Sequence, residues 1–62
     1  MSNRTSIVIY REESRNPGGR AYLCADGTTS SDRNEAAHRW FSQFDAVVAE
    51  NHVVHPAKFE VA

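Results

Sequence analysis

The sequence predicts a small α+β domain with ββαβ order, in which a three-stranded antiparallel sheet carries one helix on one face. Three observations indicate this class: two strand-like runs around Asn-Pro-Gly-Gly, an amphipathic stretch of helical period, and a short alternating segment near the end. Sixty-two residues make a single domain, residues 1–62. A chain of this length buries only about 60% of its unfolded surface, so its core is thin.

The first two strands are predicted to form a β-hairpin. Residues 6–13 read SIVIYREE and residues 20–25 read RAYLCA, and both runs contain the β-branched and aromatic side chains that strands prefer. Between them, Pro17 fixes one φ angle and the two glycines that follow permit positive φ. We therefore expect a hairpin whose loop spans residues 14–18.

The alternation of side chains sets the expected register of this hairpin. Side chains alternate between the two faces of a strand, and a slip by one residue would mix the apolar faces. The register that keeps the faces apart pairs Ile7 with Ala25, Ile9 with Leu23, Val8 with Cys24 and Tyr10 with Tyr22. Both faces of the hairpin are therefore apolar.

A helix is predicted from Asp32 to Glu50 or Asn51. Asp32 is a typical N-cap residue, and Glu35 three positions later resembles the second half of a capping box. The apolar positions that follow recur with the period of one buried helical face: Ala37, Trp40, Phe41, Phe44, Val47 and Val48.

The third strand is predicted over residues 57–61, AKFEV, where apolar and charged side chains alternate. Because the helix returns along the sheet, this strand should run antiparallel to the first strand, which gives the spatial order 2-1-3. The alternative places it beside the second strand, parallel to it, after a right-handed crossover.

One helix can cover only one face of such a sheet. That face would pack its apolar residues under the helix: Ile7, Ile9, Ala21, Leu23, Phe59 and Val61 under Trp40, Phe41, Phe44 and Val48. The opposite face would show Val8, Tyr10, Tyr22 and Cys24 to solvent. We interpret this open face as a surface for a partner or a second copy; the alternative is a cross-strand tyrosine pair that only stiffens the hairpin.

The charge distribution does not favour an avid nucleic-acid binder, because such proteins are far more basic than this chain, whose net charge is −1. Residues 1–22 carry four arginines and two glutamates, a net +2, and residues 23–62 carry three basic and six acidic side chains, a net −3. Arg11, Arg15 and Arg20 lie near the hairpin tip, where they suit contacts to phosphate groups or to an acidic protein surface, unless they are simply solvated.

We expect no metal, no cofactor and no enzymatic activity. His52 and His55 supply only two nitrogen ligands, whereas a zinc site needs three or four, and no local pattern brings Cys24 to them. A nucleophilic cysteine would also need an activating base and a cleft. No apolar run is long enough to span a membrane, the first residues lack a signal-peptide core, and a lone cysteine suits a reducing compartment, so we expect a cytoplasmic protein.

The N-terminal part of the chain resembles a known group of inhibitors. Residues 2–27, SNRTSIVIYREESRNPGGRAYLCADG with RNPG at the turn, are similar to the hairpin region of a small phage-encoded anti-CRISPR protein that inhibits type I systems. The resemblance implies a non-enzymatic protein–protein inhibitor in the cytoplasm of a bacterial host. It would bind a type I CRISPR-Cas surveillance complex or effector subunit and block target DNA recognition or nuclease recruitment.

For such a partner we expect binding through the open sheet face and the hairpin tip, with an acidic second surface on the helix: Tyr10, Tyr22, Arg11, Arg15 and Arg20, then Asp45 and Glu50. The partner would be a protein, not nucleic acid, and the chain would be a monomer or a weak homodimer. The alternative function is a small nucleic-acid-binding regulator or an antitoxin-like module that uses the basic hairpin tip.

Overall fold

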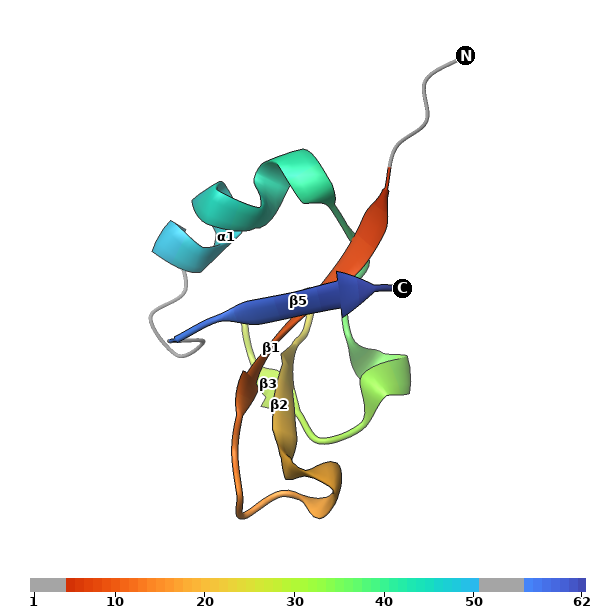
Figure 1. The fold of residues 1–62 in the computed structure, drawn as a ribbon, viewed down its shortest axis with the longest axis vertical. Helices are drawn as coiled ribbons and strands as arrows, with labels where there is room; N and C mark the ends of the chain where they lie inside the picture. Colours follow the sequence, from red (N-terminus) through yellow and green to blue (C-terminus); the bar gives the residue numbers. More distant parts are fainter. Residues whose placement is uncertain (1–4, 51–55) are drawn as a thin grey trace.

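Strand β1 (Ser6–Glu12) is the centre of an α+β fold, because three other strands pair with it, all antiparallel (Figure 1). The computed structural model describes residues 5–50 and 56–62. The other strands are β2 (Arg20–Leu23), β3 (Thr29–Ser30), β4 (Arg39–Trp40) and β5 (Lys58–Val61). The single α-helix among these residues is α1 (Phe44–Glu50), and three short 3₁₀ turns are η1 (Pro17–Gly19), η2 (Arg33–Glu35) and η3 (Phe41–Gln43).

The predicted hairpin and its register are confirmed where β1 and β2 meet. Tyr10 lies opposite Tyr22, and the neighbouring pairs continue toward the turn. The turn itself bends through Gly18 and Gly19, whose φ angles of 81° and 74° are in the left-handed region that favours glycine. The N–H of Glu13 donates to the carbonyl of Gly19 at 2.9 Å and closes the loop.

The hairpin is shorter than predicted at its open end. Strand β2 ends at Leu23, and the chain turns at once, with the N–H of Gly27 donating to the carbonyl of Cys24 at 3.1 Å. The predicted pairing of Ile7 with Ala25 and of Val8 with Cys24 is therefore wrong. The place beside Ile7 is taken by Arg39 of β4, so β2 and β4 share one edge of β1.

The predicted long helix is wrong over its first two thirds. Asp32 does cap a turn, since its carboxylate accepts from the N–H of Asn34 at 2.9 Å, but that turn is the three-residue η2. At Ala36 the backbone becomes extended, with φ −67° and ψ 137°, and the chain then enters the strand β4. The α-helix begins only at Phe44 and ends at Glu50.

The segment between η2 and η3 is extended instead of helical, and it covers the second face of the sheet. Ala36 packs there against Val8, Tyr10 and Tyr22, all of which are buried. Burying a large side chain stabilises a protein by about 1.5–3 kcal/mol, whereas helix propensity differs by only a few tenths of a kcal/mol per ordinary residue. Covering three such side chains therefore outweighs the helical preference of this stretch.

The predicted third strand is present as β5, antiparallel to β1, with Ile9 opposite Phe59. The order β2–β1–β5 agrees with the predicted order of the three main strands, and the parallel alternative is wrong. The sheet has five strands instead of three within the described residues, because β3 and β4, of two residues each, extend it.

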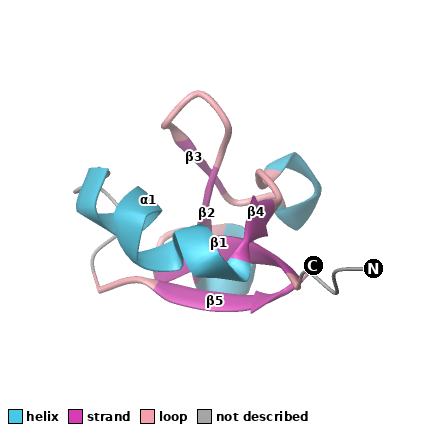
Figure 2. Cartoon of the chain, turned by 90° about the horizontal axis from the view of Figure 1, so that it is seen from above, coloured by secondary structure: helices cyan, strands magenta, loops and turns pink. Residues whose placement is uncertain are grey.

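The core has two parts, one on each side of β1. The first contains Ile7, Ile9, Leu23 and Val47, with Phe44, Val48 and Ala57 packed against it. The second contains Val8, Tyr10, Tyr22 and Ala36. Helix α1 and turn η2 lie on opposite sides of the sheet (Figure 2), so the predicted open face does not exist.

Candidate protein-interaction surface

Exposed apolar side chains gather where η3 meets β5. The rings of Phe41 and Phe59 lie 5.0 Å apart, centroid to centroid, and nearly perpendicular at 81°, and Phe59 also contacts Phe44 at 4.9 Å. Val61 follows Phe59 by two residues on the same face of β5. Their exposed fractions are 53% for Phe41, 38% for Phe59 and 65% for Val61. We call these three residues the aromatic patch.

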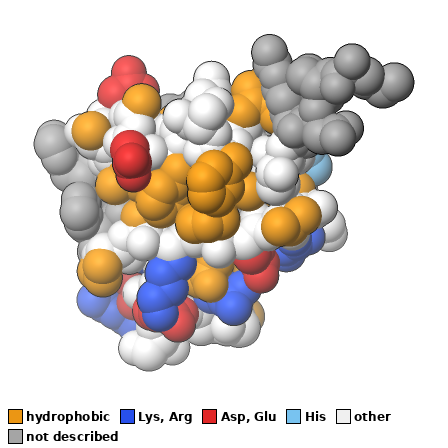
Figure 3. Space-filling view, turned by 45° about the horizontal axis from the view of Figure 1, so that its top comes forward, with side chains coloured by type: hydrophobic (Ala, Val, Ile, Leu, Met, Phe, Trp, Pro, Cys, Tyr) orange, Lys and Arg blue, Asp and Glu red, His pale blue; other side chains and the backbone are white. Residues whose placement is uncertain are grey.

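The aromatic patch corrects the prediction that Phe41 and Trp40 belong to the core, since Trp40 is also 41% exposed. Helix α1 has seven residues, about 10 Å of length; it packs over Ile7, Ile9 and Leu23 and contacts the outer strand through Phe44. Hydrophobic side chains are visible over the middle of the face in Figure 3, next to acidic and basic groups. Such an exposed apolar cluster is typical of an interaction site.

The two acidic residues predicted as a second surface are both exposed on α1. Asp45 is in the first turn of the helix, four residues after Phe41 in the sequence. Glu50 is the last residue of the helix, at its other end. The two acidic residues therefore lie at opposite ends of α1, with Asp45 at the end that follows Phe41 in the sequence.

The two predicted partner-binding tyrosines are not open to a partner. Tyr10 is 8% exposed and Tyr22 is 6% exposed, and their ring centroids lie 5.6 Å apart. The guanidinium carbon of Arg20 lies 4.1 Å above the centre of the Tyr10 ring, a cation–π contact. The tyrosine pair is thus covered by Ala36 on the sheet face and by Arg20 from the hairpin.

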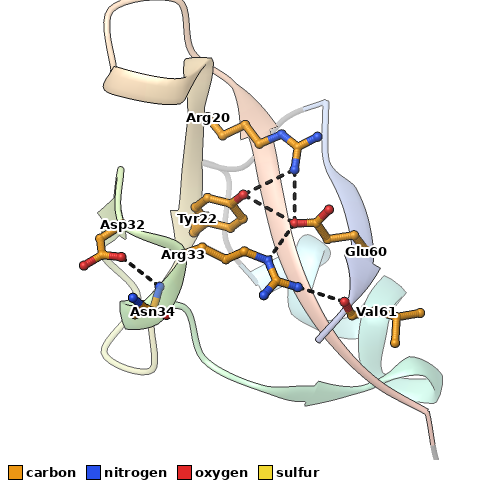
Figure 4. A network of polar contacts seen from close by, with 7 residues as sticks. All are labelled: Arg20, Tyr22, Asp32, Arg33, Asn34, Glu60 and Val61. Atoms are coloured by element: carbon orange, nitrogen blue, oxygen red, sulfur yellow. Dashed lines mark hydrogen bonds and ion pairs between the residues drawn. The ribbon is translucent and has the colours of Figure 1, made fainter.

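A polar network closes this face and joins three elements (Figure 4). One carboxylate oxygen of Glu60, from β5, accepts from Arg20 at 3.0 Å and from Arg33 of η2 at 2.9 Å. The Tyr22 hydroxyl lies between, 3.2 Å from Arg20 and 3.4 Å from Glu60. Arg33 also donates to the carbonyl of Val61 at 2.8 Å. We call Arg20, Tyr22, Arg33 and Glu60 the Glu60 network.

The charges in the Glu60 network stabilise one another. Hydrogen bonds from Arg33 and then Arg20 lower the pKa of Glu60 below the ordinary value of 4.5. The pKa of Arg20 is raised, first by its hydrogen bond with the Tyr22 hydroxyl and then by that with Glu60. The network thus holds η2 and β5 against the tyrosine pair, and Arg20 is a structural residue here.

The hydroxyl of Tyr22 can be tested alone. Tyr22→Phe keeps the buried ring and removes only the hydrogen bonds, so we expect it to lower the free energy of unfolding by about 1 kcal/mol in a urea titration. Tyr10→Phe is the matched control, because the Tyr10 hydroxyl has no hydrogen-bond partner among residues 5–50 and 56–62. Equal losses in the two variants would contradict a role for the Tyr22 hydroxyl.

The three arginines predicted at the hairpin tip do not form one basic surface. The Arg15 side chain is 90% exposed and lies 3.8 Å from Glu13, and Arg11 lies 3.4 Å from the same carboxylate. Arg20 points into the Glu60 network. Glu13 therefore offsets much of the positive charge that the sequence placed at the tip.

The residues considered for metal binding or catalysis do not come together in the described structure. Within residues 5–50 and 56–62, no group of three or more His, Cys, Asp or Glu side chains is placed to hold a metal ion. Cys24 is half-buried, and its thiol donates to the carbonyl of Tyr22 at 3.8 Å. His52 and His55 lie outside the described residues. In the same part of the chain, no helix has the length and apolar character to cross a membrane.

Comparisons of the chain with protein-family models, with curated proteins and with solved structures each found no match. No relative therefore supplies site residues, and the candidate surface rests on the exposure and contacts of this chain's residues alone. Sequence reasoning missed the aromatic patch because it assigned Phe41 and Phe59 to the core. The signal that was available is the edge position of the third strand, which leaves Phe59 covered from one side only.

Proposed function

We propose that this chain is a non-enzymatic inhibitor that acts by binding a protein partner through the aromatic patch. The observation that carries the proposal is the exposure of two phenylalanines in ring contact and of a valine on the same face of β5. Aromatic side chains at the centre of an interface supply most of its binding energy, and a polar rim excludes water around them. Asp45 suits such a rim, since it is exposed in the first turn of α1.

The partner we propose is a type I CRISPR-Cas surveillance complex or one of its effector subunits, in the cytoplasm of a bacterial host. The support for this class is the resemblance of residues 2–27 to the hairpin region of an anti-CRISPR protein. A bound chain of this size can block target DNA recognition or nuclease recruitment by occupying a surface, without cofactor or chemistry. Strand β1 of the hairpin pairs with β5, which contains Phe59 and Val61 of the aromatic patch. The hairpin that carries the resemblance therefore also holds the strand that contains most of the patch.

The test is co-elution of the purified chain with a purified type I surveillance complex, with target DNA binding by that complex as the functional readout. We expect Phe41→Glu to weaken capture by about 30-fold or more, because truncating or charging a hot-spot residue costs about 2 kcal/mol. Ser31→Glu is the matched control: Ser31 is exposed, the new charge is the same, and the residue lies in the loop between β3 and η2. The control should bind as the wild type does.

Two further variants test whether the other two surfaces predicted from the sequence contact the partner. Arg15→Glu tests the hairpin tip and Glu50→Lys tests the far end of α1, and both side chains are exposed. We expect both to change capture less than Phe41→Glu does. Equal capture by the Phe41→Glu variant and the wild type would reject the aromatic patch as the contact. Failure of the wild type to bind any type I complex would reject the proposed partner.

A second candidate function is a nucleic-acid-binding regulator or antitoxin-like module that uses the hairpin tip. The 90% exposure of the Arg15 side chain favours it. Binding led by phosphate contacts weakens steeply as salt concentration rises, and loss of one arginine reduces that slope by about one. Titration of single- and double-stranded DNA and RNA with wild type and Arg15→Gln at several salt concentrations separates this function from protein capture.

A further inference from the structure

The outer edge of β5 carries backbone groups that point away from β1. The N–H of Ala62 donates to the carbonyl of Ser6 at 3.0 Å, so the backbone of Ala62 points toward β1. Because alternate residues of a strand direct their N–H and C=O groups to opposite edges, those of Phe59 and Val61 point outward. The hydrogen bond from Arg33 to the Val61 carbonyl agrees with this direction.

This edge has no strand beside it among the described residues. Strand β5 pairs only with β1 there, and the outward N–H and C=O of Phe59 make no hydrogen bond within those residues. Figure 2 shows β5 at the margin of the sheet, away from β2 and β3. An unpaired edge of this kind is a template for another strand.

The sequence around Phe59 is complementary to itself when a second copy runs antiparallel. Rotation about an axis through Phe59 places Lys58 of one copy opposite Glu60 of the other, and Ala57 opposite Val61. Opposite residues share a face, so the apolar residues meet on one face and two ion pairs form on the other. The outward groups of the two Phe59 residues then hydrogen-bond to each other across the axis.

The competing register is less favourable. Pairing about Glu60 would place the two Glu60 carboxylates directly opposite each other, and like charges in that position destabilise a sheet. In the register about Phe59, the Val61 carbonyl would accept both Arg33 and the N–H of Ala57 of the second copy, since a carbonyl oxygen has two lone pairs. The Glu60 network can therefore remain in place.

We propose that two copies of this chain form a symmetric dimer through β5, with the strands antiparallel about Phe59. The dimer joins the two sheets and brings the two aromatic patches together, so that the exposed ring of each Phe59 is covered by the other copy. Four-residue strands make an interface smaller than the roughly 1,200–2,000 Å² of a stable complex, so the dimer is weak and depends on concentration. The inference does not rest on the proposed function.

The first test uses the isolated chain over a series of concentrations. We expect the mass in sedimentation equilibrium to rise from 7.0 kDa toward twice that value as concentration increases. Amide hydrogen exchange, measured by NMR, should show protection of Phe59 and Val61 that grows with concentration. The amides of Lys58 and Glu60, which face β1, should be protected at every concentration.

The second test is the double variant Glu12→Lys with Lys58→Glu. Within one copy Lys58 lies 3.5 Å from Glu12. The double variant exchanges the two charges, so it keeps an exposed ion pair at this place and leaves the net charge unchanged. Across the dimer the new carboxylate at position 58 of each copy lies opposite Glu60 of the other, so two like-charge pairs replace two ion pairs. The dissociation constant should therefore rise about tenfold or more. Because Glu12 also lies opposite Arg20 in the hairpin, the unfolding midpoint of the dilute monomer should fall slightly, and the single variant Glu12→Lys measures that part alone.

Three results would overturn the proposal: a mass that stays at 7.0 kDa at every concentration, protection of the Phe59 amide that does not follow dimer formation, or a double variant that dimerises as tightly as the wild type. None of these measurements includes a CRISPR-Cas component or a nucleic acid. Their failure is therefore distinct from failure of the proposed function.

Discussion

Ile9→Ala is expected to remove most of the protein's free energy of folding at 25 °C. Ile9 is 0% exposed and packs in the first core cluster with Ile7, Leu23 and Val47. Truncating a buried isoleucine to alanine costs about 2–5 kcal/mol. A chain of 62 residues has a total stability of only about 3–9 kcal/mol, at about 0.05–0.15 kcal/mol per residue. One substitution can therefore remove most of the free energy of folding.

The measurement is the far-ultraviolet circular dichroism signal followed through thermal and urea unfolding. Val61→Ala is the matched control, because it also shortens an apolar side chain of the sheet but one that is 65% exposed, so we expect a change within about 0.5 kcal/mol. Dilute samples keep any self-association out of the comparison. An Ile9→Ala variant with the unfolding midpoint of the wild type would show that this cluster is not the core.

Acid is expected to destabilise the protein through Glu60, and Glu60→Gln is expected to remove that part of the pH dependence. The pKa of Glu60 is lowered in the folded state, first by the hydrogen bond from Arg33 and then by that from Arg20. A carboxylate with a lowered pKa adds stability that is complete above its unfolded pKa of 4.5 and is lost as pH falls through the folded value. Stability should therefore fall below pH 4.5.

The measurement is the free energy of unfolding as a function of pH for the wild type, Glu60→Gln and the control Glu35→Gln. The control removes an exposed carboxylate outside the Glu60 network. Asp26 also has a lowered pKa, first because the Thr28 hydroxyl donates to its side chain, so some acid sensitivity should remain in Glu60→Gln. Parallel pH curves for the wild type and Glu60→Gln would contradict the role of the network.

The sequence predicted the parts of the fold that local chemistry controls. The turn at Gly18 and Gly19 and the alternation along β1 and β2 were enough to give the hairpin and the pairing of Tyr10 with Tyr22. The alternating apolar and charged residues of β5 were enough to give a strand, whereas its antiparallel direction was predicted from a helix that returns along the sheet. Neighbouring residues carry this information, so it can be read without knowing the rest of the structure.

The segment around Ala36 could not be predicted in the same way. Its apolar spacing matches a helix, but in the structure the backbone at Ala36 is extended and Ala36 packs on Tyr10 and Tyr22. The same difficulty applies to the Glu60 network, because Glu60 and Tyr22 are 38 residues apart in the sequence. The aromatic patch was missed for a related reason. With residues 32–43 predicted as helix, Phe41 was placed on the buried helical face and not outside the core.

The central position of β1 has a consequence for how the protein is made. On the ribosome this strand is synthesised before its partners, which begin at residues 20, 39 and 58, so its last edge cannot be closed until β5 has emerged. Pairings between residues so distant in sequence slow folding, because the chain must close large loops first. Until β5 is available, one edge of this apolar strand has no partner strand among the described residues.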